Sequence, residues 1–289
     1  MNISGHTKPF AVLGHPIGHT LSPIMHNSSI ASLGMDAIYL AFDAPPKKLM
    51  DILTSMRDMG FGGVNLTVPL KEVAFRGVDH LDTSAEIAGS VNTIEFLEDG
   101  TLRGYSTDGY GFVTAIKESF GLSLAEKSVF VLGCGGAGRA VAITCATEGI
   151  SRIVVSDIDA SRADKVVEEI RKISPDIEVE SAGTDKADWA NAAGAADLII
   201  QATPIGMKQE DAPLLTSEAF RAGQMLFDLI YMYPQTGIMS EAIAAGAKAA
   251  NGLGMLLHQG ARSFEIWTGQ TPDISAMRTA LEQAVYPQQ

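Results

Sequence analysis

The chain contains the sequence Val129-Phe130-Val131-Leu132-Gly133-Cys134-Gly135-Gly136-Ala137-Gly138. Four apolar residues of strand type run directly into glycines spaced as G-x-G-x-x-G. The next segments read as a helix, Ala140–Thr147, and a strand, Arg152–Ser156, which ends at Asp157. That acid follows the last glycine by about 20 residues, the spacing of a Rossmann unit. This order of elements predicts a Rossmann domain that binds a dinucleotide.

The glycine turn supplies the candidate cofactor-binding residues Gly133, Gly135, Gly136, Ala137 and Gly138. Glycines let the backbone approach a pyrophosphate, and the N-terminus of the following helix offers unpaired amides and a partial positive charge. The alternative is that these glycines only permit tight packing of the strand on the helix. Together with the strand, helix and acid, they favour the cofactor site.

Asp157 is expected to accept hydrogen bonds from the adenosine ribose. Its carboxylate would repel the extra phosphate of NADP by roughly 3 kcal/mol per charge pair at ~5 Å and an effective dielectric constant of ~20. The following Ile158 and Asp159 supply no arginine for that phosphate, although Arg162 one helical turn away could partly compensate. We therefore expect NAD to be preferred, with NADP possible.

A second informative segment is Gly62–Lys71, where polar groups and a lysine end an apolar run. Val64, Leu66 and Val68 alternate as in a strand, which predicts Asn65 and Thr67 on its opposite face, and Pro69 ends the ladder. Lys71 then lies just past a strand end. A half-buried lysine needs an anion, and Asp108 is the candidate. For Asn65 and Thr67, the alternative is that they form the solvent face of an exposed edge strand. For Lys71, the alternative is a solvated surface lysine.

The pattern of segments predicts an α/β fold with two domains. Strand-like and helix-like stretches alternate through the first third and again from residue 128 to about 250. Ser22-Pro23 is typical of a helix start with a serine N-cap, and a hairpin is expected at 92–105. We expect a substrate-binding and catalytic domain at 1–107, completed by helices at 254–289, and a Rossmann NAD(P)-binding domain at 108–253.

Composition narrows the function classes. The net charge of −13 argues against nucleic-acid binding. No apolar run approaches a membrane span or a signal peptide, so a cytoplasmic protein without a membrane partner is expected. Cys134 and Cys145 are expected to be packed thiols. A metal site at His15, His19 and His26 is disfavoured, because two prolines interrupt the helix that would align them, and no metal is predicted.

A series of motifs, one of them within the segment Gly62–Lys71, resembles the shikimate dehydrogenase family, including its quinate/shikimate branch, over nearly the full length. The motifs lie at Gly18–Pro23 with Met25–Asn27, Asn65–Lys71, Gly89–Thr93, Gly104–Gly109, Ala202–Met207, Asp228–Tyr231 and Gly252–Gly260. Two departures stand out. Thr20-Leu21-Ser22-Pro23 replaces the common Ser-x-Ser-Pro, and Asp157-Ile158-Asp159 replaces the Asn-Arg-Thr of the NADP branch.

The resemblance implies a role for each matching position. Lys71 and Asp108 resemble the catalytic pair. The positions that resemble substrate-binding residues are Thr20, Ser22 and Tyr231 for the carboxylate, and Asn65, Thr67, Asn92 and Gln259 with Asp108 for the ring hydroxyls and reacting oxygen. Within the later motifs, Thr203, Leu229, Gly252 and Met255 resemble cofactor-binding residues.

The implied reaction interconverts 3-dehydroshikimate and shikimate, or 3-dehydroquinate and quinate. A hydride moves between the nicotinamide and the carbon bearing the secondary alcohol, while Lys71 takes or returns the hydroxyl proton. Two alternatives remain: a catalytically silent ligand sensor of the same fold, and a dehydrogenase of an amino-substituted shikimate analogue. The sequence leaves monomer or homodimer open.

Overall fold

The computed structural model describes residues 3–286 and divides the chain into two compact units. The first comprises residues up to Gly111 together with those from Leu256, and the second is Phe112–Met255. None of the helices within residues 3–286 is both long and apolar enough to cross a membrane. The functions predicted for the two domains stay predictions at this point.

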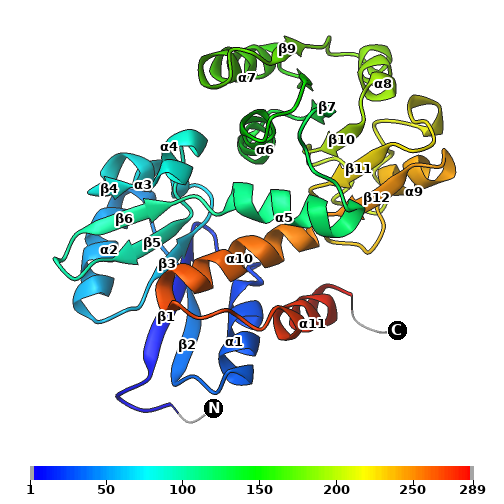
Figure 1. Ribbon diagram of the computed structural model, residues 1–289. Helices are drawn as coiled ribbons and strands as arrows, with labels where there is room; N and C mark the ends of the chain where they lie inside the picture. The colour runs from blue at the N-terminus through cyan, green and yellow to red at the C-terminus, as the bar shows by residue number, and fades with distance from the viewer. Residues whose placement is uncertain (1–2, 287–289) are drawn as a thin grey trace. The chain divides into compact units, whose positions relative to one another are not determined.

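The first unit is built on a six-stranded mixed sheet in the order β2-β1-β3-β5-β6-β4 (Figure 1). Parallel pairs join β1 to β2, β1 to β3 and β4 to β6, and antiparallel pairs join β3 to β5 and β5 to β6. The predicted hairpin is therefore confirmed as β5–β6. The strand bounds are β1 Lys8–Gly14, β2 Ala37–Asp43, β3 Val64–Leu66, β4 His80–Leu81, β5 Thr93–Phe96 and β6 Leu102–Tyr105.

Helices cover both faces of this sheet. One face packs apolar side chains of α2, α3 and α4, and the other packs those of α1 and α10. Helix α11 lies against α1. The bounds are α1 Ser22–Ser32, η1 Pro46–Lys48, α2 Leu49–Asp58, α3 Lys71–Gly77, α4 Thr83–Ala88, α5 Asp108–Phe120, α10 Leu253–Thr268 and α11 Ile274–Val285.

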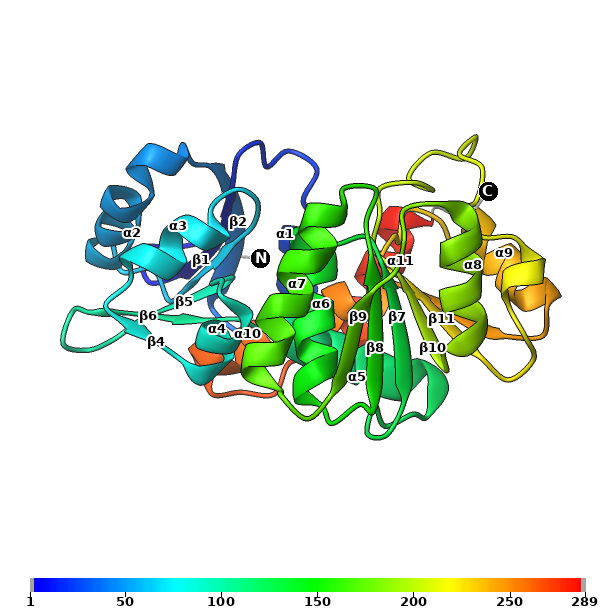
Figure 2. The same cartoon turned by 90° about the horizontal axis from the view of Figure 1, so that it is seen from above.

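The second unit has a six-stranded, wholly parallel sheet in the order β12-β11-β10-β7-β8-β9 (Figure 2). This is the strand order of a doubly wound dinucleotide-binding fold, and it confirms the Rossmann prediction. Apolar residues of α5, α6 and α7 pack on one face, and those of α8 and α9 on the other. The bounds are β7 Ser128–Leu132, α6 Gly136–Thr147, β8 Arg152–Ser156, α7 Ala160–Ile173, β9 Glu178–Ser181, α8 Lys186–Ala195, β10 Leu198–Gln201, η2 Ser217–Ala219, β11 Met225–Asp228, α9 Gly237–Ala244 and β12 Lys248–Asn251.

Two local expectations are wrong. Leu21 is the N-cap of α1 and Ser22 its first residue, since the Ser22 backbone amide turns back to the Thr20 hydroxyl. The strand expected to run through Val68 ends at Leu66, and Val68 is 71% exposed. The alternative of an exposed edge strand is excluded, because β3 pairs with strands on both sides. The sequence reading also missed the short elements α3, β4 and α4, which carry too few residues for a periodic signal.

The two cysteines match their prediction. Cys134 and Cys145 are free and buried, at 6% and 0% exposure. Burial raises the pKa of the Cys134 thiol to about 12 and that of Cys145 further. Both side chains therefore stay neutral and pack as small apolar groups.

Candidate active site

Lys71 and Asp108 each stand at the first residue of a helix, α3 and α5 respectively. Leu70, fully buried, anchors the start of α3 in the core. The Lys71 carbonyl accepts a hydrogen bond from the Val91 amide, which ties this helix start to the segment entering β5. Thr107, 2% exposed, anchors the start of α5 in the same way. Both functional side chains thus begin from backbone that the core fixes.

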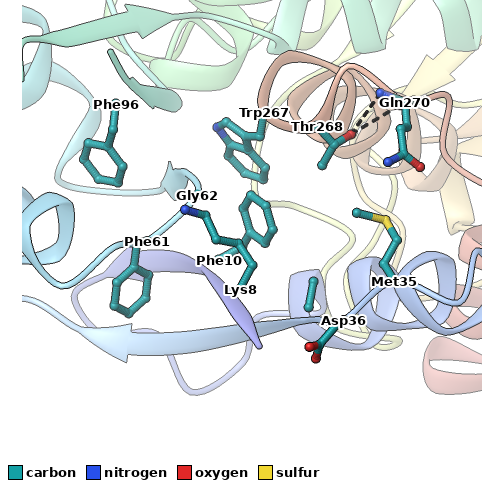
Figure 3. A pocket seen from close by; sticks show the side chains of 11 residues that line it. Lys8, Phe10, Met35, Asp36, Phe61, Gly62, Phe96, Trp267, Thr268 and Gln270 are labelled. Carbon is teal, nitrogen blue, oxygen red and sulfur yellow. Dashed lines mark hydrogen bonds between the residues drawn. The ribbon is translucent and has the colours of Figure 1, made fainter. Parts of the chain in front are cut away.

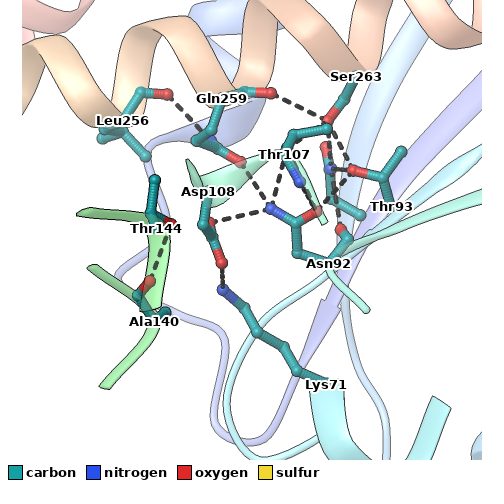
Figure 4. A network of polar contacts seen from close by, with 11 residues as sticks. Lys71, Asn92, Thr93, Thr107, Asp108, Ala140, Thr144, Leu256, Gln259 and Ser263 are labelled. Carbon is teal, nitrogen blue, oxygen red and sulfur yellow. Dashed lines mark hydrogen bonds and ion pairs between the residues drawn. The ribbon is translucent and has the colours of Figure 1, made fainter. Parts of the chain in front are cut away.

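The two side chains form an ion pair, with 2.6 Å between Lys71 Nζ and Asp108 Oδ2 (Figure 4). They are partly buried, with side-chain exposures of 27% and 17%. The other carboxylate oxygen, Asp108 Oδ1, accepts a hydrogen bond from Asn92 Nδ2 at 2.9 Å. The carboxylate therefore bridges the ammonium and the amide and leaves the lysine open to solvent. The predicted partner of Lys71 is in place.

Asn92 is held from several sides. Its backbone joins the neighbouring strands, with Leu66 N donating to Asn92 O and Asn92 N donating to Tyr105 O. Its side-chain oxygen accepts from Thr107 N and from Thr93 Oγ1, both at 2.9 Å. Its side-chain nitrogen also lies 3.4 Å from Gln259 Oε1. The structure thus brings together Lys71, Asn92, Asp108 and Gln259, as the resemblance implies.

Three further polar residues belong to this cluster and were not predicted: Thr93, Thr107 and Ser263. The Ser263 hydroxyl donates to Gln259 O at 3.1 Å and lies 2.8 Å from Thr93 Oγ1 and 3.3 Å from Thr107 Oγ1. Ser263 lies four residues after Gln259 on α10. Residues with this spacing share one face of a helix, so the position of Gln259 could have indicated Ser263 as a member of the cluster. Thr107 sits in the same motif as Asp108.

Asn65 is buried, at 5% exposure, and its amide is fully engaged by protein. Its oxygen accepts from Tyr39 Oη at 2.7 Å, and its nitrogen lies within 3.1 Å of three acceptors, on Asn92, Thr93 and Ser263. Thr67 is half-buried, and its backbone amide donates to Leu13 O. Substrate contacts of Asn65 and Thr67 stay predictions.

Thr20 and Ser22 lie side by side at the start of α1. The Thr20 hydroxyl donates to Ser22 Oγ at 3.3 Å and accepts from the Ser22 amide at the same distance. Ser22 is 8% exposed and Thr20 half-buried. Two neighbouring hydroxyls can donate to both oxygens of a carboxylate without adding net charge. Their assignment to the substrate carboxylate stays a prediction.

A separate pocket of about 340 Å³ opens at the amino ends of β1 and β2 (Figure 3). Phe10, Phe61 and Trp267 line it together with Lys8 and Asp36. None of the predicted site residues does. Ligands of open α/β sheets bind outside the carboxyl ends of parallel strands. The pocket therefore lies at the opposite end from the predicted chemistry.

In the second unit the glycine turn links β7 to α6. Gly133 has a positive φ of 102°, and an added Cβ on Gly138 would lie 1.8 Å from Gly133 O, so these two glycines permit close packing. An added Cβ at Gly135 or Gly136 would meet nothing within 4 Å. The missing side chains there leave open space at the N-terminus of α6, where no side chain caps the helix. That space suits a pyrophosphate.

Asp157 follows β8 and is 7% exposed. Its Oδ2 accepts the Cys134 amide at 2.8 Å, which holds the glycine turn, and its Oδ1 accepts the Asp159 amide at 2.9 Å. The next side chain, Ile158, is apolar yet 83% exposed. Arg162 pairs with Asp159, with 3.5 Å between Nε and Oδ2. The carboxylate thus has a structural role in addition to any contact with a ribose.

The remaining assigned residues follow the ends of β10 and β11. Gln201 holds the loop that contains Thr203, accepting its amide at 2.8 Å. Asp228 holds the next loop, which contains Leu229 and Tyr231, by accepting the Ile230 amide and the Thr236 hydroxyl.

Burial raises the pKa of Asp228 to about 6 and also raises that of Tyr231. An added Cβ on Gly252 would lie 2.3 Å from Leu229 O, and Met255 is half-buried. The cofactor contacts of these positions, and the substrate contact of Tyr231, stay predictions.

These features fit a nicotinamide dinucleotide: open space at an uncapped helix N-terminus, an acid at the end of β8 and an exposed apolar residue beside it. When bound, such a cofactor supplies a hydride acceptor or donor. The residues that would hold it are those of the turn from Gly133 to Gly138, with Asp157.

Comparisons with protein families, with curated sequences and with solved structures all match shikimate dehydrogenases. The family description "Shikimate dehydrogenase substrate binding domain" matches residues 12–94, and "Shikimate 5'-dehydrogenase C-terminal domain" matches residues 252–282. The chain is 37% identical to a shikimate dehydrogenase (NADP(+)) of Methanopyrus kandleri, with 97% of each chain covered.

Solved structures of related proteins extend this result. Shikimate 5-dehydrogenase of Listeria monocytogenes in complex with shikimate and NAD is 33% identical, with a TM-score of 0.91 and coverage of 97% of this chain and 98% of that one. Quinate dehydrogenase of Corynebacterium glutamicum in complex with NAD is 27% identical, with a TM-score of 0.87 and coverage of 95% and 98%. The chain therefore belongs to the shikimate dehydrogenase family of NAD(P)-dependent oxidoreductases.

Proposed function

We propose that this protein interconverts 3-dehydroshikimate and shikimate with NAD as the preferred cofactor, and that Lys71 and Asp108 are its catalytic pair. The observation that carries the proposal is the 2.6 Å contact between Lys71 Nζ and Asp108 Oδ2 within a network that also holds Asn92 and Gln259. In its neutral amine form lysine can take the proton of a secondary alcohol, and as an ammonium it can return that proton; it exchanges between the two forms far more readily than the guanidinium of arginine.

The residues around the pair fit a polyhydroxylated ring. Asn92, Gln259 and Asp108 offer donors and acceptors within one cluster, and the Thr20 and Ser22 hydroxyls suit a carboxylate. We assign cofactor binding to the second unit and substrate binding to the first unit, together with Tyr231 of the second. Thr67 and Tyr231 complete the proposed substrate contacts, and Thr203, Leu229, Gly252 and Met255 the cofactor contacts.

Asp157 supports the preference for NAD. Its carboxylate occupies the position where a 2′-phosphate would need a cation, and the nearby Arg162 is already paired with Asp159. The relatives from Listeria monocytogenes and Corynebacterium glutamicum were solved with NAD. The name of the relative from Methanopyrus kandleri specifies NADP(+), so the preference needs a direct test.

The direct test is a set of initial rates with NAD or NADP, each with shikimate or quinate in excess. We expect turnover mainly with NAD and shikimate. Faster turnover with quinate would assign the chain to quinate use. No turnover in any of the four pairings would reject the proposal and favour a ligand sensor or an enzyme for an amino-substituted analogue.

Asp157→Asn should raise the ratio of kcat/KM for NADP to that for NAD by about tenfold or more, because it removes one charge near the 2′-phosphate while keeping one of the two oxygens that accept backbone amides. Steady-state kinetics with both cofactors measure the ratio. Asp164→Asn on the exposed side of α7 is the control, and its ratio should stay within about twofold of the wild type. An unchanged ratio in Asp157→Asn would assign cofactor selection to other residues.

A further inference from the structure

The Tyr39 side chain lies between the two ends of the proposed substrate site. Tyr39 is in β2, is 1% exposed, and its phenol donates to Asn65 Oδ1 at 2.7 Å. The Ser22 side chain lies near enough to this phenol to oppose the rise in its pKa that burial causes. One buried hydroxyl thus lies between the residue proposed for the substrate carboxylate and the network around the catalytic pair.

The Tyr39 hydrogen bond fixes the orientation of the Asn65 amide. With Asn65 Oδ1 occupied by the phenol, Asn65 Nδ2 must face Asn92 O, Thr93 Oγ1 and Ser263 Oγ, which are 2.9 to 3.1 Å away. A flipped amide would bring its oxygen against the Asn92 carbonyl and leave the phenol facing a donor. The phenol proton and the Asn92 carbonyl oxygen therefore favour the same orientation of the Asn65 amide.

From Asn65 the contacts reach the catalytic carboxylate in two steps. Asn65 Nδ2 binds the Asn92 backbone oxygen and the Thr93 hydroxyl, and Thr93 in turn donates to Asn92 Oδ1. These contacts direct Asn92 Nδ2 toward Asp108 Oδ1 at 2.9 Å (Figure 4). An amide buried in such a network gains its orientation from every partner at once.

We propose that Tyr39 is a positioning residue of this active site, which acts through the Asn65 amide to hold Asn92 against the catalytic carboxylate of Asp108. The inference rests on the proposed function of Lys71 and Asp108. Burial raises the pKa of Tyr39 well above its usual value, so the phenol stays a neutral donor at physiological pH. The ring of His26, stacked at 4.1 Å between centroids and 6° between planes, fixes the ring of Tyr39.

The test is Tyr39→Phe, which keeps the ring and removes only the hydroxyl. It should lower kcat by about tenfold with little change in the KM for shikimate, because a buried acceptor on Asn65 loses its donor and the network relaxes. Tyr105→Phe is the matched control. Tyr105 is in β6 of the same sheet, its phenol donates to Glu95 at 2.6 Å, and the loss of this contact should change kcat by less than about twofold.

A double-mutant cycle separates positioning from a general loss of packing. In an Asn65→Ala background, Tyr39→Phe should lower kcat by less than about twofold, because the Asn65 amide that links Tyr39 to Asn92 is already absent. An equal effect in both backgrounds would overturn the proposal, as would a rise in KM with unchanged kcat, which would assign Tyr39 to the carboxylate end instead.

A second readout needs no turnover. In the ligand-free protein, the side-chain amide protons of Asn92 should exchange slowly with solvent in the wild type and in Tyr105→Phe, and measurably faster in Tyr39→Phe, as followed by NMR with labelled asparagine. Equal protection in all three proteins would overturn the proposal. If the wild type turns over no substrate, the proposed function fails, while this measurement still decides whether Tyr39 positions Asn92.

Discussion

Lys71→Ala should lower kcat for shikimate oxidation by about 10²- to 10⁴-fold, the range that general acid–base catalysis contributes. The lysine is the basic group paired with Asp108, and alanine leaves no group at that place to take the hydroxyl proton. KM should change much less, because Asn92, Gln259 and the Thr20 and Ser22 hydroxyls remain. Steady-state kinetics under saturating cofactor measure both constants.

Two variants sharpen this test. Lys71→Arg keeps the positive charge beside Asp108 but bears a guanidinium that does not lose its proton in proteins, so its kcat should also be low. Lys47→Ala removes an exposed lysine of η1 and should leave kcat within about twofold of the wild type. Recovery of most turnover in Lys71→Arg would show that charge, rather than proton transfer, is the lysine's contribution. Turnover above about a tenth of the wild type in Lys71→Ala would reject its catalytic role.

The Rossmann half of the fold could be predicted from sequence because its signals are local. Gly133 adopts a positive φ of 102°, and a Cβ on Gly138 would lie 1.8 Å from Gly133 O, so the spacing of these glycines reports the geometry of the turn directly. The buried strand β7 and the acid at the end of β8 stand at fixed distances from that turn. Each of these features constrains only residues that are close along the chain.

The polar network around the proposed catalytic pair could not be predicted in this way, because its contacts join residues far apart in the sequence. Asn65 Nδ2 bonds to Ser263 Oγ, 198 residues away in sequence, and its oxygen bonds to a tyrosine in an apolar strand. No local pattern distinguishes Tyr39 from an ordinary core residue. Val68 shows the opposite error, since alternation predicted a strand that includes it, whereas the strand ends at Leu66 and leaves Val68 exposed. Strand length here depends on pairing with β1 and β5, which sequence periodicity does not contain.

His26→Phe should make the protein markedly more resistant to acid. His26 is 1% exposed, and burial lowers its pKa to about 3 from the 6.5 of a solvated histidine. Below pH 6.5 the His26 imidazole is protonated in the unfolded chain but stays neutral in the folded protein. The free energy of unfolding therefore decreases as pH falls from 6.5 toward 3. The loss from this one group amounts to about 2 kcal/mol at pH 5 and about 4 kcal/mol at pH 3.

Phenylalanine fits the same place. The rings stacked or tilted against His26 are those of Tyr39, Phe264 and Trp267, none of them charged, and neither imidazole nitrogen has a hydrogen-bond partner within residues 3–286. At pH 7 the variant should therefore be as stable as the wild type or more so, because two buried polar atoms without partners are replaced by carbon.

Urea unfolding at pH 7, 5 and 4 measures the free energy of unfolding of the wild type and of His26→Phe. The effects of acid on all other groups cancel in the difference between the two values. The gap in unfolding free energy should widen in favour of His26→Phe at each lower pH. His6→Asn is the control, since this histidine is exposed and its replacement should leave the pH dependence of the wild type unchanged. Parallel losses of stability in His26→Phe and wild type would mean that the folded protein admits a proton, or water, to this ring.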